Sequence, residues 1–333
     1  MKVLITGAAG FIGRALCRDL IHDGHSVVAL DLGEQFIRSR EYFADLSKSG
    51  KLRIAGCSIF DCTALSEHSI GCDVVVHLAA MVDVGKIIDQ TSYALAINIM
   101  GTQNVVQACA MNGVKQIVFS STSAVYGIPR ELPVTEETIA GCDAIYGLSK
   151  LTGEAFVKAG SQKNSSLNYT ILRVFNIYGP GQSLGFIIPR LLNQAADGVP
   201  MTIYGDGSQK RCFTHVNDIC AAFSGAIGNS KVFGQTFNIG NRDEVHSINQ
   251  LAKLVAEIYG VPFDFKFLAE SYDIRSSRFV SEMFCNSDAA EDALNFKPKI
   301  SLRDGLKQMV RAIKKEQNPS LATIGQYFLD SNF

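Results

Sequence analysis

The stretch Lys2-Val-Leu-Ile-Thr-Gly-Ala-Ala-Gly-Phe-Ile-Gly13 decides the fold of this 333-residue chain. Its apolar run predicts a buried strand over residues 2–6, and the spacing of apolar residues after it predicts a helix over residues 11–21. Glycine recurs there at every third position, as Gly7, Gly10 and Gly13. Glycine lets the backbone turn tightly and leaves no Cβ in front of the N–H groups at the helix N-terminus. The turn therefore predicts a site for an anion such as a pyrophosphate.

The second predicted strand, residues 26–30, leads into Asp31, 18 residues beyond Gly13. A carboxylate at the end of this strand can accept hydrogen bonds from both hydroxyls of a ribose, and it would repel a 2′-phosphate. A glycine turn alone is a weak signal, because tightly packed turns also use glycine. Strand, turn, helix, strand and acid together predict a dinucleotide site that favours NAD over NADP.

Short apolar runs alternate with longer amphipathic segments through the first half of the chain. This alternation predicts an α/β fold, a Rossmann-type doubly wound parallel sheet with right-handed crossovers. Glycine- and proline-rich pieces after residue 175 predict a smaller mixed α/β substrate-binding lobe. We predict a dinucleotide-binding domain from residues 1–174 plus 212–240, and a second domain from residues 175–211 plus 241–325. The predicted strands span residues 2–6, 26–30, 52–55, 73–77, 116–119, 169–174 and 236–239, and the predicted helices include 11–21, 93–111 and 217–227.

Composition and charge exclude several kinds of protein. A hydrophobic content of 47% and a charged content of 19% are typical of a folded globular chain. Because 31 Lys and Arg balance 32 Asp and Glu, nothing favours nucleic acid or a membrane surface as partner. No apolar run approaches the roughly 20 residues that span a bilayer. The nine cysteines contain no Cys-x-x-Cys pair, so we expect reduced thiols, a cytoplasmic location and no metal site.

Tyr146 and Lys150 are four residues apart, which places both side chains on one face of a helix. A phenol with a pKa of about 10 is a poor base at neutral pH, but an adjacent ammonium stabilises the phenolate. Such a pair by itself is common on solvated helix faces. Here it accompanies a dinucleotide fold and the hydroxyl cluster of residues 120–122 behind a predicted strand, so the pair indicates a catalytic site.

Three motifs together resemble a known family. The spacing G-x-x-G-x-x-G over residues 7–13, His77-Leu-Ala-Ala80 and Tyr146-Gly-Leu-Ser-Lys150 are similar to the extended short-chain dehydrogenase/reductase superfamily. Within it, the chain resembles the NAD-dependent nucleotide-sugar epimerase/dehydratase family over residues 1–315. This resemblance implies NAD as cofactor and a catalytic triad of Thr122, Tyr146 and Lys150. The cofactor contacts that it implies are Gly7, Gly10, Phe11, Ile12, Gly13, Asp31, Ser58, Ile59, Leu78, Ala79, Ala80, Asn98, Tyr146, Lys150 and Phe175.

The resemblance also implies a reaction. Tyr146 takes a proton from a sugar hydroxyl while the attached carbon gives a hydride to NAD, which leaves a 4-keto sugar in the site. The family's dTDP-glucose-type 4,6-dehydratases have an Asp-Glu pair directly after the threonine, and its decarboxylases and GDP-mannose dehydratases have a glutamate two residues after it. Those positions are Ser123 and Ala124 here, and neither side chain is an acid or base near neutral pH. We therefore expect a 4-epimerase, which returns the hydride to the other face of the sugar.

Two later segments resemble the substrate side of the family. Residues 172–181 are similar to a strand-end segment, which implies that Asn176 contacts the substrate pyrophosphate and that Phe175 lies over the nicotinamide. Residues 204–215 are similar to the motif G-D-G-x-x-x-R-D-F, which implies that Arg211 binds a phosphate with its fork of donors. A surface salt bridge is the alternative for Arg211.

Four positions depart from the family pattern. Ser58 replaces an aspartate that contacts adenine, which leaves base binding to the backbone of the next residue. Glu270 replaces a second phosphate-binding arginine, and Arg275 is predicted to take over this contact. Asp83 stands near the sugar, where a small or hydroxyl residue is usual, so it is a candidate to select a substrate hydroxyl or amine. Ser277 stands where a tyrosine narrows the pocket of glucose-only epimerases, so a 2-acetamido group is expected to fit.

These observations favour an NAD-dependent 4-epimerase of a nucleotide sugar, most simply a UDP-hexose, with UDP-GlcNAc as a further candidate. One alternative is a 4-ketoreductase, or an epimerase of a deoxy- or amino-sugar nucleotide in which Asp83 reads the altered group. Another is a non-catalytic dinucleotide-binding regulator. The family packs the equivalents of helices 93–111 and 144–160 into a dimer interface, which implies a homodimer, although ordinary core packing also explains their apolar stripes.

Overall fold

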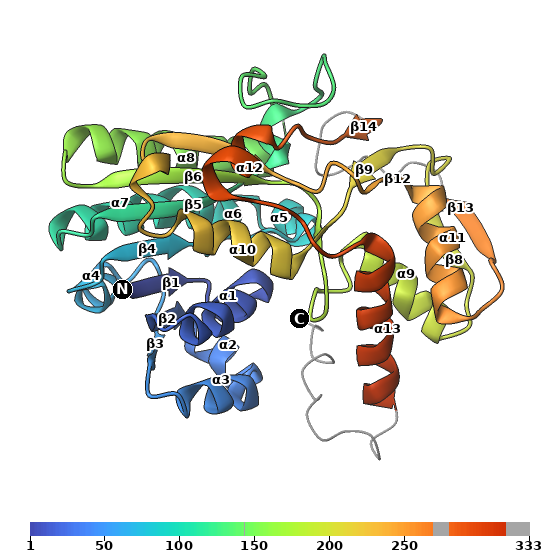
Figure 1. The fold of residues 1–333 in the computed structure, drawn as a ribbon, viewed down its shortest axis with the longest axis horizontal. Helices are drawn as coiled ribbons and strands as arrows, with labels where there is room; N and C mark the ends of the chain where they lie inside the picture. The colour runs from blue at the N-terminus through green and yellow to red at the C-terminus, as the bar shows by residue number, and fades with distance from the viewer. Residues whose placement is uncertain (143, 269–279, 318–333) are drawn as a thin grey trace.

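A seven-stranded sheet forms the larger part of the structure, a computed structural model that describes residues 1–142, 144–268 and 280–317 (Figure 1). Its strands are β1 (Lys2–Thr6), β2 (Ser26–Asp31), β3 (Leu52–Gly56), β4 (Val74–His77), β5 (Gln116–Thr122), β6 (Asn168–Val174) and β11 (Gln235–Ile239). They are ordered β11-β6-β5-β4-β1-β2-β3, and all neighbours run parallel. The order reverses between β1 and β4, where a ligand crevice is expected outside the carboxyl ends of the strands. The predicted doubly wound α/β fold is confirmed.

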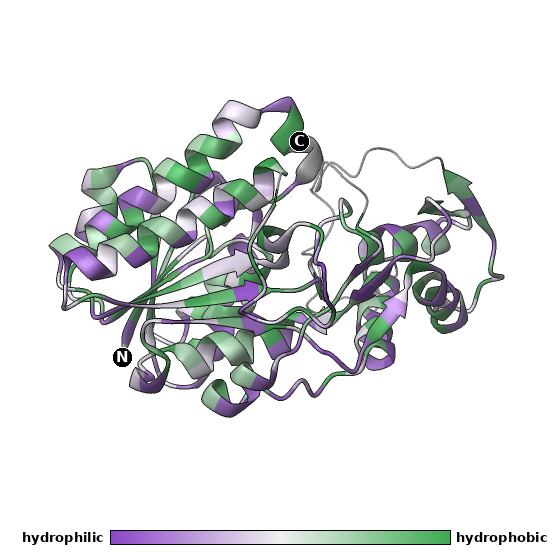
Figure 2. Ribbon diagram, turned by 90° about the horizontal axis from the view of Figure 1, so that it is seen from above, coloured by the Kyte–Doolittle hydropathy of each residue, from purple (hydrophilic) through white to green (hydrophobic). Residues whose placement is uncertain are grey.

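Helices cover both faces of this sheet. They are α1 (Phe11–His22), α2 (Gly33–Arg38), α3 (Arg40–Ser47), α4 (Cys62–Ser69), α7 (Thr102–Met111), α8 (Ile145–Lys163), α10 (Val216–Ala226) and α12 (Asp288–Leu294). Val3 and Ile5 of β1 pack with α1 and α10, whereas Leu4 between them packs with α4, α7 and α8. Figure 2 shows hydrophobic residues along the strands and mixed with hydrophilic ones along the helices. Burial on both faces explains why the strands are continuous apolar runs in the sequence.

The helix predicted over residues 93–111 forms as three consecutive segments after α5 (Val84–Asp89). These are α6 (Thr91–Leu95), a π-helical stretch η1 (Ala96–Gly101), and α7. The Thr102 hydroxyl donates to the Asn98 carbonyl oxygen at 2.7 Å, and the Asn98 side chain bonds to Met81 outside the helix. Side chains thus compete with the α-helical ladder at this point. Such π-helical stretches are frequent at functional sites.

The second lobe lies on the right in Figure 1. Its helices are α9 (Ile187–Ala196), α11 (Ile248–Tyr259) and α13 (Leu302–Gln317), which pack their apolar faces together around Leu191, Leu251 and Leu306. Its short strands are β7 (Ile177–Tyr178), β8 (Met201–Tyr204), β9 (Lys210–Cys212), β10 (Thr214–His215), β12 (Val245–Ser247), β13 (Phe265–Leu268) and β14 (Glu282–Met283). They form the sheets β10-β7, β12-β9-β14 and β13-β8. Two 3₁₀ turns, η2 (Ser123–Tyr126) and η3 (Ser230–Val232), complete the described elements.

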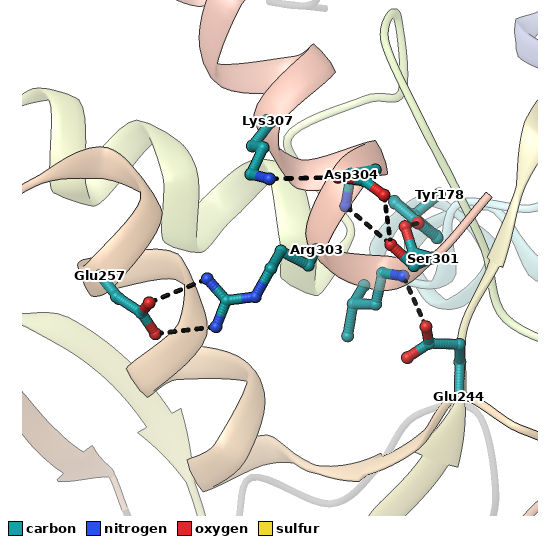
Figure 3. A network of polar contacts seen from close by, with 8 residues as sticks. Tyr178, Glu244, Glu257, Ser301, Arg303, Asp304 and Lys307 are labelled. Atoms are coloured by element: carbon teal, nitrogen blue, oxygen red, sulfur yellow. Dashed lines mark hydrogen bonds and ion pairs between the residues drawn. The ribbon is translucent and has the colours of Figure 1, made fainter.

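Polar contacts fix the start of α13 against the rest of the molecule (Figure 3). The Leu302 N–H donates to the Glu244 carboxylate at 3.0 Å, and the Tyr178 hydroxyl donates to the Ser301 carbonyl oxygen at 3.1 Å. The Ser301 hydroxyl in turn donates to Asp304 at 2.8 Å. Because Tyr178 lies on β7, just beyond β6, these bonds tie the start of α13 to the segment of chain that leaves the main sheet.

Candidate active site

The glycine turn between β1 and α1 forms a cradle that larger side chains would fill. Gly7 has a φ of +71°, and a Cβ there would lie 2.7 Å from the Ala79 nitrogen. A Cβ on Gly13 would collide with the Gly7 carbonyl oxygen. The loop after β4 is held against this turn by Thr6, whose carbonyl and hydroxyl oxygens accept the N–H groups of Leu78 and Ala79 at 3.1 and 3.3 Å. Both glycines are therefore required by close backbone approach.

The N-terminus of α1 suits an anion. Gly10 is its N-cap, and across the described chain no side chain caps this end and no acid lies in its first turn. The first N–H groups of a helix have no partner within it, and they stand at the positive end of its dipole. Phe11 and Ile12 thus present donors toward the predicted pyrophosphate position.

Asp31 ends β2 beside this turn. Its Oδ2 accepts the Ala9 N–H at 3.0 Å and its Oδ1 accepts the Leu32 N–H at 2.8 Å. Burial raises the pKa of Asp31 above its ordinary value, and the two N–H bonds oppose part of that rise. Each carboxylate oxygen has a second lone-pair direction, so Asp31 can still accept from ribose hydroxyls. The cradle, the helix N-terminus and this acid fit NAD: α1 would hold the pyrophosphate, and Asp31 would hold the adenosine ribose.

His77 closes β4 behind the cradle and is fully buried. Its Nδ1 lies 2.7 Å from the Thr6 hydroxyl, and its Nε2 lies 3.0 Å from the Thr102 hydroxyl. Because Thr102 already donates to the Asn98 carbonyl oxygen, it accepts from Nε2–H, and Thr6 donates to Nδ1. Burial, with the charge of Lys150 adding to it, lowers the pKa of His77 to about 3. His77 is therefore a neutral link between β1, β4 and α7.

Tyr146 and Lys150 lie on the first turns of α8, beside the strand end that carries Thr122. The two elements touch: a Cβ on Gly147 would lie 2.5 Å from the Ala124 carbonyl oxygen. Thr122 is the last residue of β5, and its hydroxyl accepts the Ala124 N–H at 3.2 Å. The structure thus brings the three predicted catalytic residues to one place, at the carboxyl edge of the sheet.

Lys150 is an ammonium group in an apolar setting. The residue is 3% exposed, and its Nζ lies 4.4 Å from the centroid of the Phe119 ring on β5. Burial lowers the pKa of Lys150 to about 7, and the Glu154 carboxylate one turn later opposes part of that effect. Strongly displaced pKa values of this kind are typical of functional sites. That Lys150, in its charged form, stabilises a phenolate at Tyr146 remains a prediction.

Asn98 and Ser149 hold this helix to the loop after β4. The Asn98 Oδ1 accepts the Met81 N–H at 2.8 Å, and its Nδ2 donates to the Met81 carbonyl and to the Ser149 hydroxyl, both at 3.0 Å. Ser149 in turn donates to the Tyr146 carbonyl oxygen at 2.7 Å. The Asn98 side chain therefore holds the loop after β4 to the first turn of α8, and its direct contact with the cofactor remains a prediction.

The chain after β6 carries the predicted substrate contacts. The Asn176 side-chain nitrogen is buried, and it has no hydrogen-bond partner within the described residues, so it is a donor available to a ligand. Arg211 donates to the carbonyl oxygens of Val280 and Ser281 at 2.8 and 3.3 Å, which ties β9 to the residues before β14. Its predicted phosphate contact remains a prediction. The predictions for Glu270, Arg275 and Ser277 lie outside the described residues.

Three predicted cofactor contacts have other partners in this structure. The Ser58 hydroxyl accepts the Phe60 N–H at 3.1 Å, and the Ile59 side chain is 7% exposed within the apolar cluster under α7. Phe175 is fully buried, with its ring centroid 6.2 Å from that of Tyr126. Ala80, in contrast, is partly exposed on the loop beside the cradle. Cofactor contacts at these positions remain predictions.

A set of buried polar residues, which no sequence pattern predicted, lies behind the catalytic face. Their only signal in the sequence is a polar residue in an otherwise apolar strand or helix stripe. Hydrogen bonds connect them across β5, α8, β6 and β11. They are Ser121, Tyr126, Glu154, Arg173 and Asn238.

Two further properties concern metals and membranes. Within residues 1–142, 144–268 and 280–317, no three His, Cys, Asp or Glu side chains are grouped to hold a metal ion. Over the same part of the chain, no helix has both the length and the apolar character needed to cross a membrane. All nine cysteines are free thiols.

A nucleotide cradle at the switch point of a parallel sheet, next to a Tyr–Lys pair on one helix face, defines an NAD-using enzyme of the short-chain dehydrogenase/reductase class. The family model described as "NAD dependent epimerase/dehydratase family" matches residues 3–240. The chain belongs to this family, and its cofactor is NAD.

Similar proteins catalyse different reactions on the same scaffold. A UDP-N-acetyl-alpha-D-glucosaminuronate decarboxylase of Bacillus cytotoxicus is 32% identical over 95% of this chain and 99% of its own length. The UDP-glucuronic acid 4-epimerase from Bacillus cereus, solved with UDP-glucuronic acid and NAD, is 30% identical with a TM-score of 0.86, over 95% of this chain and all of its own. DesIV, a dTDP-glucose 4,6-dehydratase from Streptomyces venezuelae solved with NAD and TYD, is 26% identical with a TM-score of 0.85, over 97% and 99% of the two chains. Family membership alone therefore does not choose between epimerisation, decarboxylation and dehydration.

Proposed function

We propose that the protein is an NAD-dependent 4-epimerase of a UDP-sugar. The observation that carries this proposal is the strand end after Thr122: it meets the first turn of α8 beside Tyr146, and the residues there are Ser123 and Ala124. Relatives named as UDP-sugar epimerases and decarboxylases, including one solved with UDP-glucuronic acid, support a UDP-sugar as substrate. A UDP-hexose is the simplest choice, and UDP-GlcNAc is a further candidate.

Each catalytic residue has a distinct task. Tyr146 accepts the proton of the sugar 4-hydroxyl, and Lys150 lowers the free energy of the phenolate that makes this possible. Thr122 orients the same hydroxyl through a hydrogen bond. NAD, when bound, supplies the acceptor and later the donor of the hydride at the sugar carbon. The cradle of Gly7 and Gly13, together with Asp31, holds that cofactor at the switch point of the sheet.

Ser123 and Ala124 separate this proposal from the other reactions of the family. Water elimination needs an acid and a base at the sugar, and in resembling dehydratases these follow the threonine directly. Neither a serine hydroxyl nor an alanine methyl group serves as a general acid or base at neutral pH. The decarboxylase relative is 32% identical, so overall similarity does not favour epimerisation; the residues beside Thr122 do.

The test is to incubate the purified chain and NAD with UDP-glucose, UDP-GlcNAc and UDP-glucuronic acid in separate reactions. We expect at least one of them to interconvert between the gluco and galacto configurations, followed by the anomeric ¹H NMR signals, without net NADH or CO₂ release. Tyr146→Phe, which keeps the ring, should lose activity by at least about a hundredfold, the lower range for a general base. Absence of 4-epimerisation of all UDP-sugars tried would overturn the proposal.

Asp83 favours a second candidate within the enzymes. A Cβ on Gly185 would lie 3.4 Å from the Asp83 Oδ2, so this carboxylate stands between the loop after β4 and the second lobe. A carboxylate at that junction suits recognition of an amino group on a sugar. The candidate is an epimerase or 4-ketoreductase of an amino- or deoxy-sugar nucleotide. Stoichiometric NADH consumption with a 4-keto sugar nucleotide would favour it over simple epimerisation.

We further propose that the chain is a cytoplasmic homodimer with two lobes, residues 1–174 plus 212–240 and 175–211 plus 241–325. Two elements cross this division: α12 packs on the main sheet, and β10 pairs with β7 of the second lobe. Nine free thiols favour a reducing compartment. Tyr93, Met100 and Leu148 are 51, 48 and 44% exposed on α6, η1 and α8, which supports a helical dimer face. Light scattering of Met100→Asp should report a monomer, and an unchanged dimer would exclude this face.

A further inference from the structure

A buried polar network lies directly behind the catalytic face. The Glu154 carboxylate accepts two bonds from the Arg173 guanidinium, at 2.9 and 2.7 Å, and a third from the Ser121 hydroxyl at 2.5 Å. Arg173 also donates to the Tyr126 hydroxyl at 2.9 Å, which donates to Asn238 at 2.7 Å. All five residues are at most 6% exposed. Replacing such an ion pair with apolar residues is often neutral or stabilising, so stability alone does not account for it.

The network begins one helical turn from the catalytic lysine. Glu154 follows Lys150 by four residues on α8, so both side chains lie on the helix face that meets β5. On β5, Phe119 lies under the Lys150 ammonium and Ser121, two residues on, bonds Glu154. Residues two apart on a strand share a face, so one face of β5 contacts both charged groups of α8. Thr122 is the next residue along.

We propose that Glu154 is a positioning residue: together with Arg173 and Ser121 it fixes the catalytic turn of α8 against the end of β5 and keeps Lys150 cationic. The bidentate pair anchors α8 to β6, and the Ser121 bond anchors it to β5. The three catalytic residues sit on the two elements so joined. This inference rests on the proposed function only for its activity measurement.

The charges around Lys150 come from several elements. Among the described residues, Glu154 lies one turn along α8 and His77 ends β4, and two cations contact the Glu154 carboxylate: Arg173 of β6, and Lys158 of α8 at 3.9 Å. His77 is neutral at working pH, and the Arg173 charge is matched by its two bonds to Glu154. Glu154 is then the acidic partner that opposes the effect of burial on the pKa of Lys150. Removing its charge is expected to make Lys150 lose its proton at lower pH.

Two single substitutions separate positioning and charge support from a merely structural role. Glu154→Gln and Arg173→Gln break the same ion pair, but they leave opposite charges behind. The full chain, with and without NAD, is labelled with ¹³C at the lysine ε-carbons and titrated by NMR. Lys150 is the lysine expected to titrate near pH 7, and Lys150→Met identifies its signal. Glu136→Gln, which removes a carboxylate from the far end of the network, is the matched control.

We expect Glu154→Gln to lower the Lys150 midpoint by about one pH unit, the lower end of the effect of a neighbouring opposite charge. Arg173→Gln should leave it unchanged or raise it, and Glu136→Gln should leave it unchanged. If either single variant folds poorly, Glu154→Gln/Arg173→Gln removes both charges and should still lower the midpoint. Shifts in the same direction for both single variants, or no shift in Glu154→Gln or the double variant, would overturn the proposal.

The activity measurement follows the same logic. With a UDP-sugar as substrate, kcat is measured against pH for Glu154→Gln or the double variant. The alkaline limb of this profile should move to lower pH by the same interval as the NMR midpoint of Lys150, and KM should change less than threefold. If the wild-type chain epimerises no UDP-sugar, the proposed function fails. The NMR titration then still decides the role of Glu154, because it needs no substrate.

Discussion

Lys150→Met should inactivate the protein and at the same time stabilise it. Burial lowers the pKa of Lys150 from 10.5 to about 7, and each unit corresponds to about 1.4 kcal/mol. Below pH 7 the lysine is charged in both the folded and the unfolded chain, so the folded state carries the whole cost. That cost is on the order of 4–5 kcal/mol. Methionine fills a similar volume without a charge, so we expect a gain of a few kcal/mol at pH 6.

The stability gained by Lys150→Met should depend on pH, because the folded and unfolded chains release the Lys150 proton at different pH. Between pH 7 and 10.5 the unfolded chain keeps its lysine protonated while the folded chain releases the proton, so wild-type stability rises with pH through this window. The advantage of Lys150→Met should therefore be greatest below pH 7 and disappear above pH 10.5. The measurement is urea unfolding of NAD-free protein at pH 6, 8 and 10, with Lys163→Met, an exposed position on the same helix, as control. A gain that stays constant with pH, or a loss at pH 6, would refute the idea that desolvation is the cause.

Three other predictions concern the cofactor and substrate sites. Gly13→Ala should lower the free energy of unfolding by about 1–3 kcal/mol, measured by urea unfolding, and weaken NAD binding, measured by calorimetric titration. Gly33 has open space around it, so Gly33→Ala should change neither the stability nor the NAD affinity. Asp31→Asn leaves one of two N–H groups without its acceptor, so we expect NAD affinity to fall by about tenfold or more, again by calorimetry. Asn176→Ala should raise KM for the UDP-sugar by about tenfold with little change in kcat, and Asn193→Ala, at a partly exposed position on α9, serves as its control.

The strands and turns that depend on one local sequence pattern could be predicted from the sequence alone. The runs at residues 2–6, 26–30 and 169–174 form strands within one residue of the predicted bounds, because a strand buried on both faces must be apolar throughout. The glycine cradle could also be predicted, since close backbone approach excludes other residues there. The strand predicted over residues 116–119 extends to Thr122, because the polar residues after Phe119 still pair in register with β6.

What the sequence did not predict depends on contacts between distant segments. The π-helical stretch at residues 96–101 accompanies the bond of the Thr102 hydroxyl to the Asn98 carbonyl and the bonds of Asn98 to Met81, and no helical pattern in the sequence contains these contacts. Glu154 and Arg173 are 19 residues apart, and only the placement of β6 beside β5 brings them together. In the sequence alone, Glu154 cannot be distinguished from a solvent-exposed polar residue on a helix.

The burial of Lys150 destabilises the folded protein and, under the proposed function, also makes Tyr146 a better base. An exposed lysine keeps its proton at neutral pH but is screened by water, so it stabilises a phenolate only weakly. Burial above Phe119 strengthens that interaction and, by the same loss of water, lowers the pKa of the lysine toward the working range. The site then needs a second charge to hold the proton on Lys150, and Glu154 is the buried carboxylate one turn away. Under the proposed function, the buried Lys–Glu arrangement is therefore what a base at Tyr146 requires, and it costs folding energy.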